Sequence, residues 1–249
     1  MRKVLFTILT LIFFSTAQAV EKNIILPTAT GYIHGVLLMP DVEQPCPLVI
    51  IIAGSGPTDK DGNTIGSNYR NNSLKQLAEG LAAEGIASVR YDKRGIGESQ
   101  TAMTSEEQLS FEHYIDDAAA WADMFANDNR FSTIAIAGHS EGSLIGMVAA
   151  RKSTAVKAYI SIAGCGRPAY EVIEEQLKRQ PEQVQLEAAA INKELREERT
   201  TDDIPHYLAP LYRRSIQPYL ISWFRYNPAE EIAKLHIPVL ILQGDKDIQ

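Results

Sequence analysis

Residues 133–142 read TIAIAGHSEG, an apolar run that ends in a serine flanked by glycines. The unbroken apolar character of 133–137 is typical of a strand buried on both faces of a sheet. The small residues that follow Glu141 predict a helix over 141–152. Ser140 is therefore expected in a sharp turn, where its hydroxyl projects above the sheet. The N-terminus of the helix directs its unpaired N–H groups toward the same place.

Two glycines frame this serine. Gly138 and Gly142 stand two residues before and two residues after Ser140. Side chains at these positions would collide with the neighbouring strand and helix, so their absence permits the sharp turn. We interpret Ser140 as a candidate nucleophile for acyl transfer. The alternative is a glycine-flanked serine in an ordinary strand-to-helix turn.

Acyl transfer needs a second backbone donor, because the oxyanion of its tetrahedral intermediate is held by N–H groups. The sequence AGSGP at 53–57 follows another apolar run, and its small residues let the backbone approach a carbonyl oxygen. We predict an oxyanion hole formed by the backbone N–H groups of Ser55 and Glu141, with Gly56 as the alternative to Ser55. The competing interpretation is a glycine-rich turn that only reverses the chain.

The remaining pattern predicts an α/β fold. Helical spacing of apolar residues covers 74–82 and 111–125. Strands that alternate with helices predict a mostly parallel sheet with helices on both faces, preceded by an antiparallel hairpin at 24–26 and 32–39. Further apolar runs typical of buried strands occur at 48–53, 87–91, 158–163 and 238–242.

Residues 166–235 interrupt this alternation of strands and helices. The segment is too long for a structureless connection, since loops beyond about 15 residues are uncommon. Apolar residues recur with helical spacing over 184–195, and the aromatic-rich stretch 218–226 is also expected to be helical. We predict a helical cap inserted between two strands of the sheet. The alternative is a solvated helical extension without a role in substrate binding.

The amino-terminal residues have the features of a secretory signal. Two basic residues precede an apolar run at 4–14, which is shorter than the about 20 residues of a membrane span. The sequence AQA at 17–19 supplies the small residues that a signal peptidase recognises. We expect cleavage after Ala19 and a periplasmic or secreted protein without a stable membrane span. An uncleaved N-terminal anchor is the alternative.

Composition and charge exclude several classes of protein. The 249 residues are 45% hydrophobic and 22% charged, which is typical of a globular fold rather than a disordered or coiled-coil chain. Lys and Arg number 24 against 31 Asp and Glu, and no basic block indicates a nucleic-acid partner. The sequence DKDGN at 59–63 has its glycine too early for a calcium loop and lacks the closing Glu, so we predict no metal site.

The two cysteines are expected at opposite ends of the sheet. Cys46 precedes one predicted strand and Cys165 follows another. A six-residue strand is about 20 Å long, whereas the Cα atoms of a disulfide lie within about 7 Å of each other. We therefore predict no disulfide between them.

Three motifs in this chain order resemble those of the α/β-hydrolase superfamily. They are GSGPTDKDGN at 54–63, DKRGIGES at 92–99 and GHSEG at 138–142. The first is similar to the oxyanion segment of exported bacterial esterases described as serine-aminopeptidase-like or thioesterase-like. The second is similar to the D-x-R-G-x-G-x-S loop of the superfamily. Ala53 departs from the pattern, because the family usually has a histidine there that orders the loop.

The resemblance implies a triad in the chain order nucleophile, acid, histidine. It places the acid at Asp247 within GDKD at 244–247, with Asp245 as the second choice. The acid would orient a histidine and stabilise its cation. Two solvated loop carboxylates are the alternative interpretation.

None of the five histidines before Gln249 fits the third place well. His206, in the predicted cap, is the only one whose position is geometrically possible. We therefore expect the catalytic histidine, a final strand and a closing helix beyond Gln249. On this view the sequence is a C-terminally truncated hydrolase, inactive without that histidine; a naturally short inactive relative is the alternative. The other four lie in the hairpin, at a helix start, beside the nucleophile and before the last strand: His34, His113, His139 and His236.

These features together predict four segments and one reaction. The segments are a signal peptide at 1–19, an α/β-hydrolase core at 20–165, a helical cap at 166–235 and a continuation of the core at 236–249. The expected reaction is hydrolysis of a small carboxylic ester through an acyl-enzyme on Ser140, without cofactor or metal. Thioesterase activity, aminopeptidase activity and a non-catalytic binding role on the same fold stay open.

The cap supplies candidate residues for substrate recognition. An aminopeptidase would need cap carboxylates to hold a substrate amine, and Glu171, Glu174 and Glu175 are available. For an esterase, we hypothesise that cap aromatics line the acyl pocket, with a packed cap interior as the alternative. These aromatics are Tyr207, Tyr212, Tyr219, Trp223 and Phe224.

Overall fold

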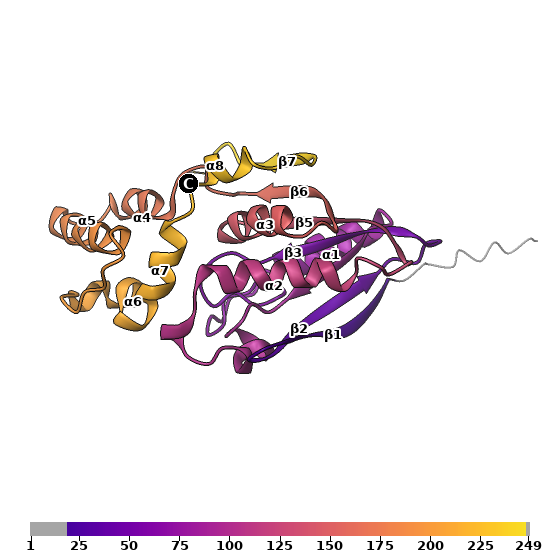
Figure 1. The fold of residues 1–249 in the computed structure, drawn as a ribbon, viewed down its shortest axis with the longest axis horizontal. Helices are drawn as coiled ribbons and strands as arrows, with labels where there is room; N and C mark the ends of the chain where they lie inside the picture. The colour runs from indigo at the N-terminus through magenta and orange to yellow at the C-terminus, as the bar shows by residue number, and fades with distance from the viewer. Residues whose placement is uncertain (1–18, 248–249) are drawn as a thin grey trace, which may run out of the picture.

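The computed structural model describes residues 19–247, so the expected signal peptide lies almost wholly outside the described residues. Within them, seven strands form one sheet in the order β1-β2-β4-β3-β5-β6-β7 (Figure 1). The strands are Val20–Thr28 (β1), Gly31–Met39 (β2), Cys46–Ile52 (β3), Ala87–Tyr91 (β4), Phe131–His139 (β5), Val156–Ile162 (β6) and Val239–Leu242 (β7).

The pairing of the strands confirms the predicted sheet. β1 pairs antiparallel with β2, and β2 pairs antiparallel with β4. From β4 onward the neighbours are parallel, with β3 and β5 at the centre and β6 and β7 toward the far edge. The leading hairpin is longer than predicted, because polar residues of β1 continue the ladder to Val20, which pairs with Met39.

No helix among the described residues has the length and apolar content of a membrane span.

Helices connect the strands and confirm the predicted alternation. The α-helices are Ser73–Ala83 (α1), Phe111–Met124 (α2), Glu141–Lys152 (α3), Ala169–Leu177 (α4), Glu182–Arg196 (α5), Ala209–Tyr212 (α6), Gln217–Phe224 (α7) and Pro228–Ile232 (α8). Short 3₁₀ helices are Gly97–Ala102 (η1), Glu106–Gln108 (η2), His206–Leu208 (η3) and Arg214–Ile216 (η4).

Two apolar layers cover the two faces of the sheet. Successive side chains of a strand point to opposite faces, so β3 contributes Ile50 to one layer and Val49 to the other. α2 and α3 cover the first face, with Phe111 and Ile145 fully buried. α1 covers the second face through Leu74 and its neighbours. Helices on both faces explain why the central strands are apolar throughout.

The cap, which we define as residues 166–235, contains α4 to α8 and lies beyond the carboxyl end of β6 (Figure 1). The predicted helical stripe at 184–195 lies within α5. The aromatic stretch predicted at 218–226 becomes α7, which begins one residue earlier because Pro218 occupies its first turn. Proline is favoured there, since the first N–H groups of a helix have no partner inside the helix.

The two cysteines lie as predicted. Cys46 is buried at the start of β3, and Cys165 follows the end of β6. They form no disulfide with each other.

β7 is the last strand of the sheet within residues 19–247. Its four side chains, from Val239 to Leu242, are 39–58% exposed, although all of them are apolar. Within residues 19–247, the strand pairs with β6 alone.

A buried ion pair joins α2 to the loop after β4. The Arg94 guanidinium donates two hydrogen bonds to Asp117, of 3.0 and 2.6 Å. A third, of 2.7 Å, goes to the carbonyl oxygen of Ala102. Arg94 and Asp117 are both buried. The neighbouring Asp116 also bonds a cation, Lys152, but that pair is exposed.

We expect Asp117→Asn to lower the free energy of unfolding by about 3 kcal/mol, because it leaves the Arg94 charge buried without its partner. The matched control Asp116→Asn removes an exposed ion pair and should change stability by less than about 1 kcal/mol. Urea denaturation of both variants measures the difference. Equal losses in the two variants would contradict the role assigned to the buried pair.

Candidate active site

The predicted turn at Ser140 is present and strained. Ser140 lies between β5 and α3 with φ 53° and ψ −119°, outside the regions that L-residues ordinarily occupy. Its backbone N–H donates a 2.9 Å hydrogen bond to the carbonyl oxygen of Ile162 at the end of β6. The surrounding strands and helix therefore hold the serine in a conformation that it would not adopt alone.

Close backbone packing explains the two glycines of the turn. A Cβ atom at Gly138 would lie 2.0 Å from the carbonyl oxygen of Gly142. A Cβ atom at Gly142 would lie 2.5 Å from the carbonyl oxygen of Ala53 at the end of β3. Neither position has room for a side chain. The turn therefore rests directly on the backbone of the neighbouring strand.

Ser140 opens into a cavity of about 410 Å³ between the sheet and the cap. Glu141 lines this cavity, and so do Ser55, Gly56 and Pro57 from the loop after β3. A Cβ atom at Gly54 would lie 3.3 Å from the Cβ atom of Ser140. The structure thus brings together the serine and both segments that the sequence indicated as oxyanion donors.

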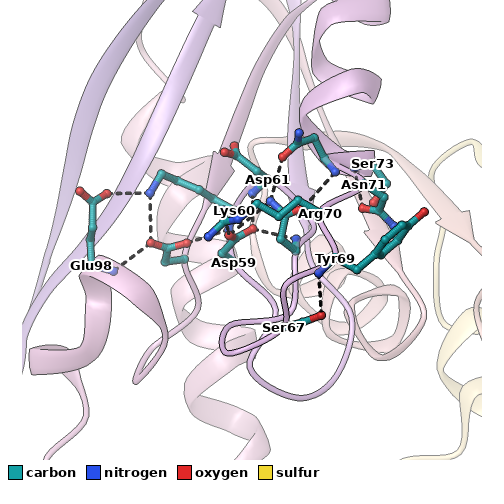
Figure 2. Close-up of polar contacts among 12 residues, drawn as sticks. Asp59, Lys60, Asp61, Ser67, Tyr69, Arg70, Asn71, Ser73 and Glu98 are labelled. Atoms are coloured by element: carbon teal, nitrogen blue, oxygen red, sulfur yellow. Dashed lines mark hydrogen bonds and ion pairs between the residues drawn. The ribbon is translucent and has the colours of Figure 1, made fainter.

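Side-chain hydrogen bonds fix the loop that carries Ser55. Asp92 accepts a 2.7 Å hydrogen bond from the backbone N–H of Lys60 and a 3.0 Å bond from that of Glu98. The Lys60 ammonium joins Asp92 at 3.2 Å and Glu98 at 2.6 Å (Figure 2). Burial lowers the pKa of Lys60, but the hydrogen bonds and charges of Glu98 and Asp92 outweigh burial and raise the pKa overall.

Asp59 braces the DKDGN segment from within. Asp59 Oδ1 accepts hydrogen bonds from the backbone N–H groups of Asp61 and Asn63, at 3.0 and 2.8 Å (Figure 2 shows Asp59 and Asp61). Within residues 19–247, His, Cys, Asp and Glu side chains form no group of three that could hold a metal ion.

A buried charged network borders the cavity, and no sequence motif predicted it. Lys93 Nζ lies 2.6 Å from Glu141 Oε2 and donates a 2.7 Å hydrogen bond to the carbonyl oxygen of Gly54. The hydroxyl of Tyr219 in α7 donates to Glu141 Oε1. Burial, reinforced by the negative charge of Glu141 and by Tyr114, raises the pKa of Tyr219. The available signal was Lys93 itself, a charge placed two residues after a buried strand.

The aromatic residues of the cap divide between the cavity and the cap interior. Tyr219 and Trp223 line the cavity, as hypothesised. The other three do not, and the hypothesis was wrong for them. Tyr212 is buried with its hydroxyl on Asn192, and Phe224 packs against Tyr170. The remaining one, Tyr207, is exposed and donates a hydrogen bond to Glu187.

Apolar residues and arginines, rather than carboxylates, line the cap side of the cavity. Arg213 is paired with Glu106, with one bond of 2.9 Å, and Arg167 lies 3.7 Å from Glu175. The three acidic candidates for an amine site do not line the cavity. The apolar part of the lining comes mainly from Leu144, Val172, Ile173, Leu211, Ile216 and Leu220.

Asp247 follows β7 and is exposed. Its carboxylate acts electrostatically on two groups beside the serine. Burial lowers the pKa of His139, and Asp247 opposes this shift. Burial also raises the pKa of the Cys165 thiol, and Asp247 adds to that shift while Arg167 opposes it. Because His139 precedes Ser140 and Cys165 lines the cavity, Asp247 lies at the same edge of the sheet as Ser140.

No histidine within residues 19–247 lines the cavity. His139 lies next to the serine at the end of β5, and His206 begins η3 in the cap. His113 is held in the first turn of α2, where its ring accepts a 3.0 Å hydrogen bond from the backbone N–H of Ser110. The structure therefore gives no support to His206 as the third member of a triad.

The strained serine between a parallel strand and a helix, beside a glycine-rich loop at the carboxyl ends of the strands, defines an α/β-hydrolase fold. The chain belongs to the serine aminopeptidase S33 family, whose profile matches residues 66–206. That match includes Ser140 and Lys93 but not Ser55, Tyr219 or Asp247.

Comparison with curated proteins points in the same direction. Esterase EstD of Thermotoga maritima is 31% identical over 241 residues, which cover 92% of this chain and 52% of that protein. The chain thus spans about half the length of the curated relative that it matches.

Solved structures share the fold at low sequence identity. Est1E from Butyrivibrio proteoclasticus has a TM-score of 0.59 and 20% identity, covering 90% of this chain and 77% of that chain. The α/β-hydrolase GrgF from Penicillium sp. sh18 has a TM-score of 0.57 and 21% identity, covering 92% and 81%. The hypothetical protein PA2218 from Pseudomonas aeruginosa has a TM-score of 0.62 and 14% identity, covering 97% and 84%.

We expect Gly142→Ala to destabilise the protein by about 1–3 kcal/mol, because the added methyl group overlaps the backbone of β3. The matched control is Gly80→Ala in α1, where an added Cβ atom meets nothing within 4 Å. There alanine should stabilise the helix by about 0.5–1 kcal/mol. Urea denaturation measures both changes, and a neutral or stabilising Gly142→Ala would contradict the close packing described above.

Proposed function

We propose that the protein is a serine hydrolase that cleaves carboxylic esters through an acyl-enzyme intermediate. The observation that carries the proposal is the strained Ser140 at the mouth of a largely apolar cavity, with Ser55 and Glu141 in the same lining. The similarity to esterase EstD supports the ester as the substrate class. The proposed segments are a core at 20–165, the cap at 166–235 and a continuation of the core at 236–249.

In the proposed reaction, Ser140 Oγ attacks the acyl carbonyl carbon and loses its proton to a histidine. The carbonyl oxygen becomes an oxyanion, held by the backbone N–H groups of Ser55 and Glu141. The tetrahedral intermediate collapses, the alkoxide leaves with the proton from the histidine, and water then releases the acid from Ser140. Asp247 orients this histidine, which follows the acid in the chain order of the superfamily.

The charges around the cavity favour an ester over a peptide with a free amino terminus. An aminopeptidase site needs an available carboxylate to hold the substrate amine. Glu141 is the carboxylate in the lining, and Lys93 and Tyr219 already occupy its two oxygens. Glu174 accepts a 3.0 Å hydrogen bond from Asn192 and faces α5 instead.

We also propose export to the periplasm or secretion, with cleavage after Ala19. The motif at the amino terminus motivates this proposal. Mass spectrometry of the protein purified from its natural host tests it, because cleavage would give a mature chain that begins at Val20. A chain that retains residues 1–19 in the cytoplasm would contradict it.

We expect Ser140→Ala to abolish covalent labelling of the full-length gene product by a fluorophosphonate probe. Ester turnover should fall by about a millionfold, because the variant has no nucleophile. The matched control is Ser132→Ala, near the start of β5, where the side chain is exposed and away from the cavity. This variant should be labelled like the wild type.

Two results would reject the serine mechanism. One is a wild-type protein that takes no label, and the other is label that persists in Ser140→Ala. Mass spectrometry of the labelled peptide identifies the modified residue in either case.

We expect kcat/KM for p-nitrophenyl esters to rise about three- to four-fold for each methylene added to a short acyl chain, because each one leaves water for the apolar lining. Leu211→Asn replaces a half-buried leucine of the lining and should flatten this rise. Leu186→Asn, on the exposed face of α5, is the control and should leave it unchanged. A wild-type response at background for every chain length would reject the esterase proposal.

A further inference from the structure

The network of Lys93, Glu141 and Tyr219 connects three separate parts of the molecule. Lys93 lies in the loop after β4, Glu141 is the first residue of α3, and Tyr219 belongs to α7 of the cap. All three are buried, with the Lys93 and Glu141 side chains only 2% and 3% exposed. Charges placed so deep are costly unless each has partners of good geometry.

Every polar atom of the network has a partner. Glu141 Oε2 contacts Lys93, and Oε1 accepts the hydroxyl proton of Tyr219. Lys93 Nζ also donates to the carbonyl oxygen of Gly54 and lies 4.9 Å from the centre of the Tyr114 ring. The network therefore requires these residue types. Replacing any of the three by a shorter or apolar side chain would leave a buried polar group without a hydrogen-bond partner.

The contacts of the network fall on the two segments proposed to form the oxyanion hole. Glu141 supplies one N–H group of that hole from its own backbone. Lys93 binds the carbonyl oxygen of Gly54, and the peptide unit of that carbonyl contains the N–H group of Ser55, the second donor. One ammonium group thus links both donors, which lie just after strands β3 and β5.

The cap joins the same arrangement through a single hydroxyl. The Tyr219 ring packs against Phe111, Tyr114 and Trp223, with ring centres 5.7–6.1 Å apart. Its hydroxyl donates a hydrogen bond to Glu141, so the position of α7 is coupled to the position of the Glu141 carboxylate. A network with only a stabilising role would not need to contact both donor segments.

We propose that Lys93, Glu141 and Tyr219 are positioning residues for the oxyanion hole. They hold its two N–H donors at the distance from each other that catalysis requires, and the position of α7 against the core sets this distance. The inference rests on the proposed serine hydrolase function. None of the three side chains reacts with the substrate. They act through the backbone of Glu141 and of Ser55.

This role has a distinct kinetic consequence. The oxyanion exists only in the transition state and the intermediate, so a misplaced donor lowers kcat and leaves KM almost unchanged. The loss is the same for every acyl chain, because all esters form the same oxyanion. Loss of a wall of the acyl pocket acts differently, since it changes KM and its effect depends on acyl length.

The test compares Tyr219→Phe with Tyr207→Phe in the full-length gene product. The first variant removes the hydroxyl that bonds Glu141 and keeps the packed ring. The second removes the hydroxyl of an exposed cap tyrosine that bonds Glu187 and does not line the cavity. We expect kcat for Tyr219→Phe to fall about ten-fold for all acyl lengths, with KM within two-fold of the wild type. Tyr207→Phe should match the wild type.

Glu141→Gln is the second variant. It tests the same inference if the Tyr219→Phe protein fails to fold. Glutamine keeps the shape of the side chain but turns one oxygen into an NH₂ donor, which then faces Lys93 or Tyr219. We expect a loss of kcat larger than ten-fold, at a KM close to that of the wild type. The rate of fluorophosphonate labelling should fall in parallel, because displacement of fluoride by Ser140 also passes through a transition state that develops negative charge on an oxygen in the oxyanion hole.

Each outcome separates the inference from the proposed function. An active wild type with unchanged kcat in both variants, even at a lower melting temperature, would overturn the inference alone. So would a loss that appears in KM and grows with acyl length, because it would make Tyr219 only a wall of the pocket. A wild type that cleaves no ester and takes no label would overturn the proposed function and the inference with it.

Discussion

The contact between the backbone of β3 and the turn at Ser140 is the constraint on which the rest of the site depends. A Cβ atom at Gly142 has no room beside the carbonyl oxygen of Ala53. The strand end and the turn can therefore touch only because Gly142 has no side chain. This contact places the loop with Ser55 beside the serine, and it requires β3 and β5 to be neighbours in the sheet. The positive φ of Ser140 follows from the same packing.

The local parts of this arrangement could be predicted from the sequence. The turn at Ser140 is encoded within ten consecutive residues, because an apolar strand, two glycines and a helix start leave one geometry. The loop after β3 was predictable for the same reason. Parallel strands present their carboxyl ends at one edge, so two glycine-rich segments that follow such strands meet there. The fold class and most strands were likewise predictable from periodicity.

Contacts between side chains distant in sequence could not be predicted in this way. Lys93 and Glu141 are 48 positions apart, and Tyr219 is another 78 positions away. As letters, these residues look like surface charges and one cap aromatic among several. Only the fold shows that Tyr219 contacts Glu141, whereas Tyr207 faces solvent. The triad roles of Asp247 and a histidine rest on the resemblance, since neither residue type has a local pattern.

The attachment of α7 determines how the cap is joined to the core. Besides Tyr219, this helix uses Ser222, whose hydroxyl accepts a 2.8 Å hydrogen bond from the N–H of Phe111, and Trp223, which stacks on the Phe111 ring. α7 is thus bound to Glu141 and to the start of α2, and it packs as part of the core. α7 also contacts α4, because Phe224 packs edge-on against Tyr170. The wall of the cavity that α4 provides through Val172 and Ile173 is therefore anchored to the core by way of α7.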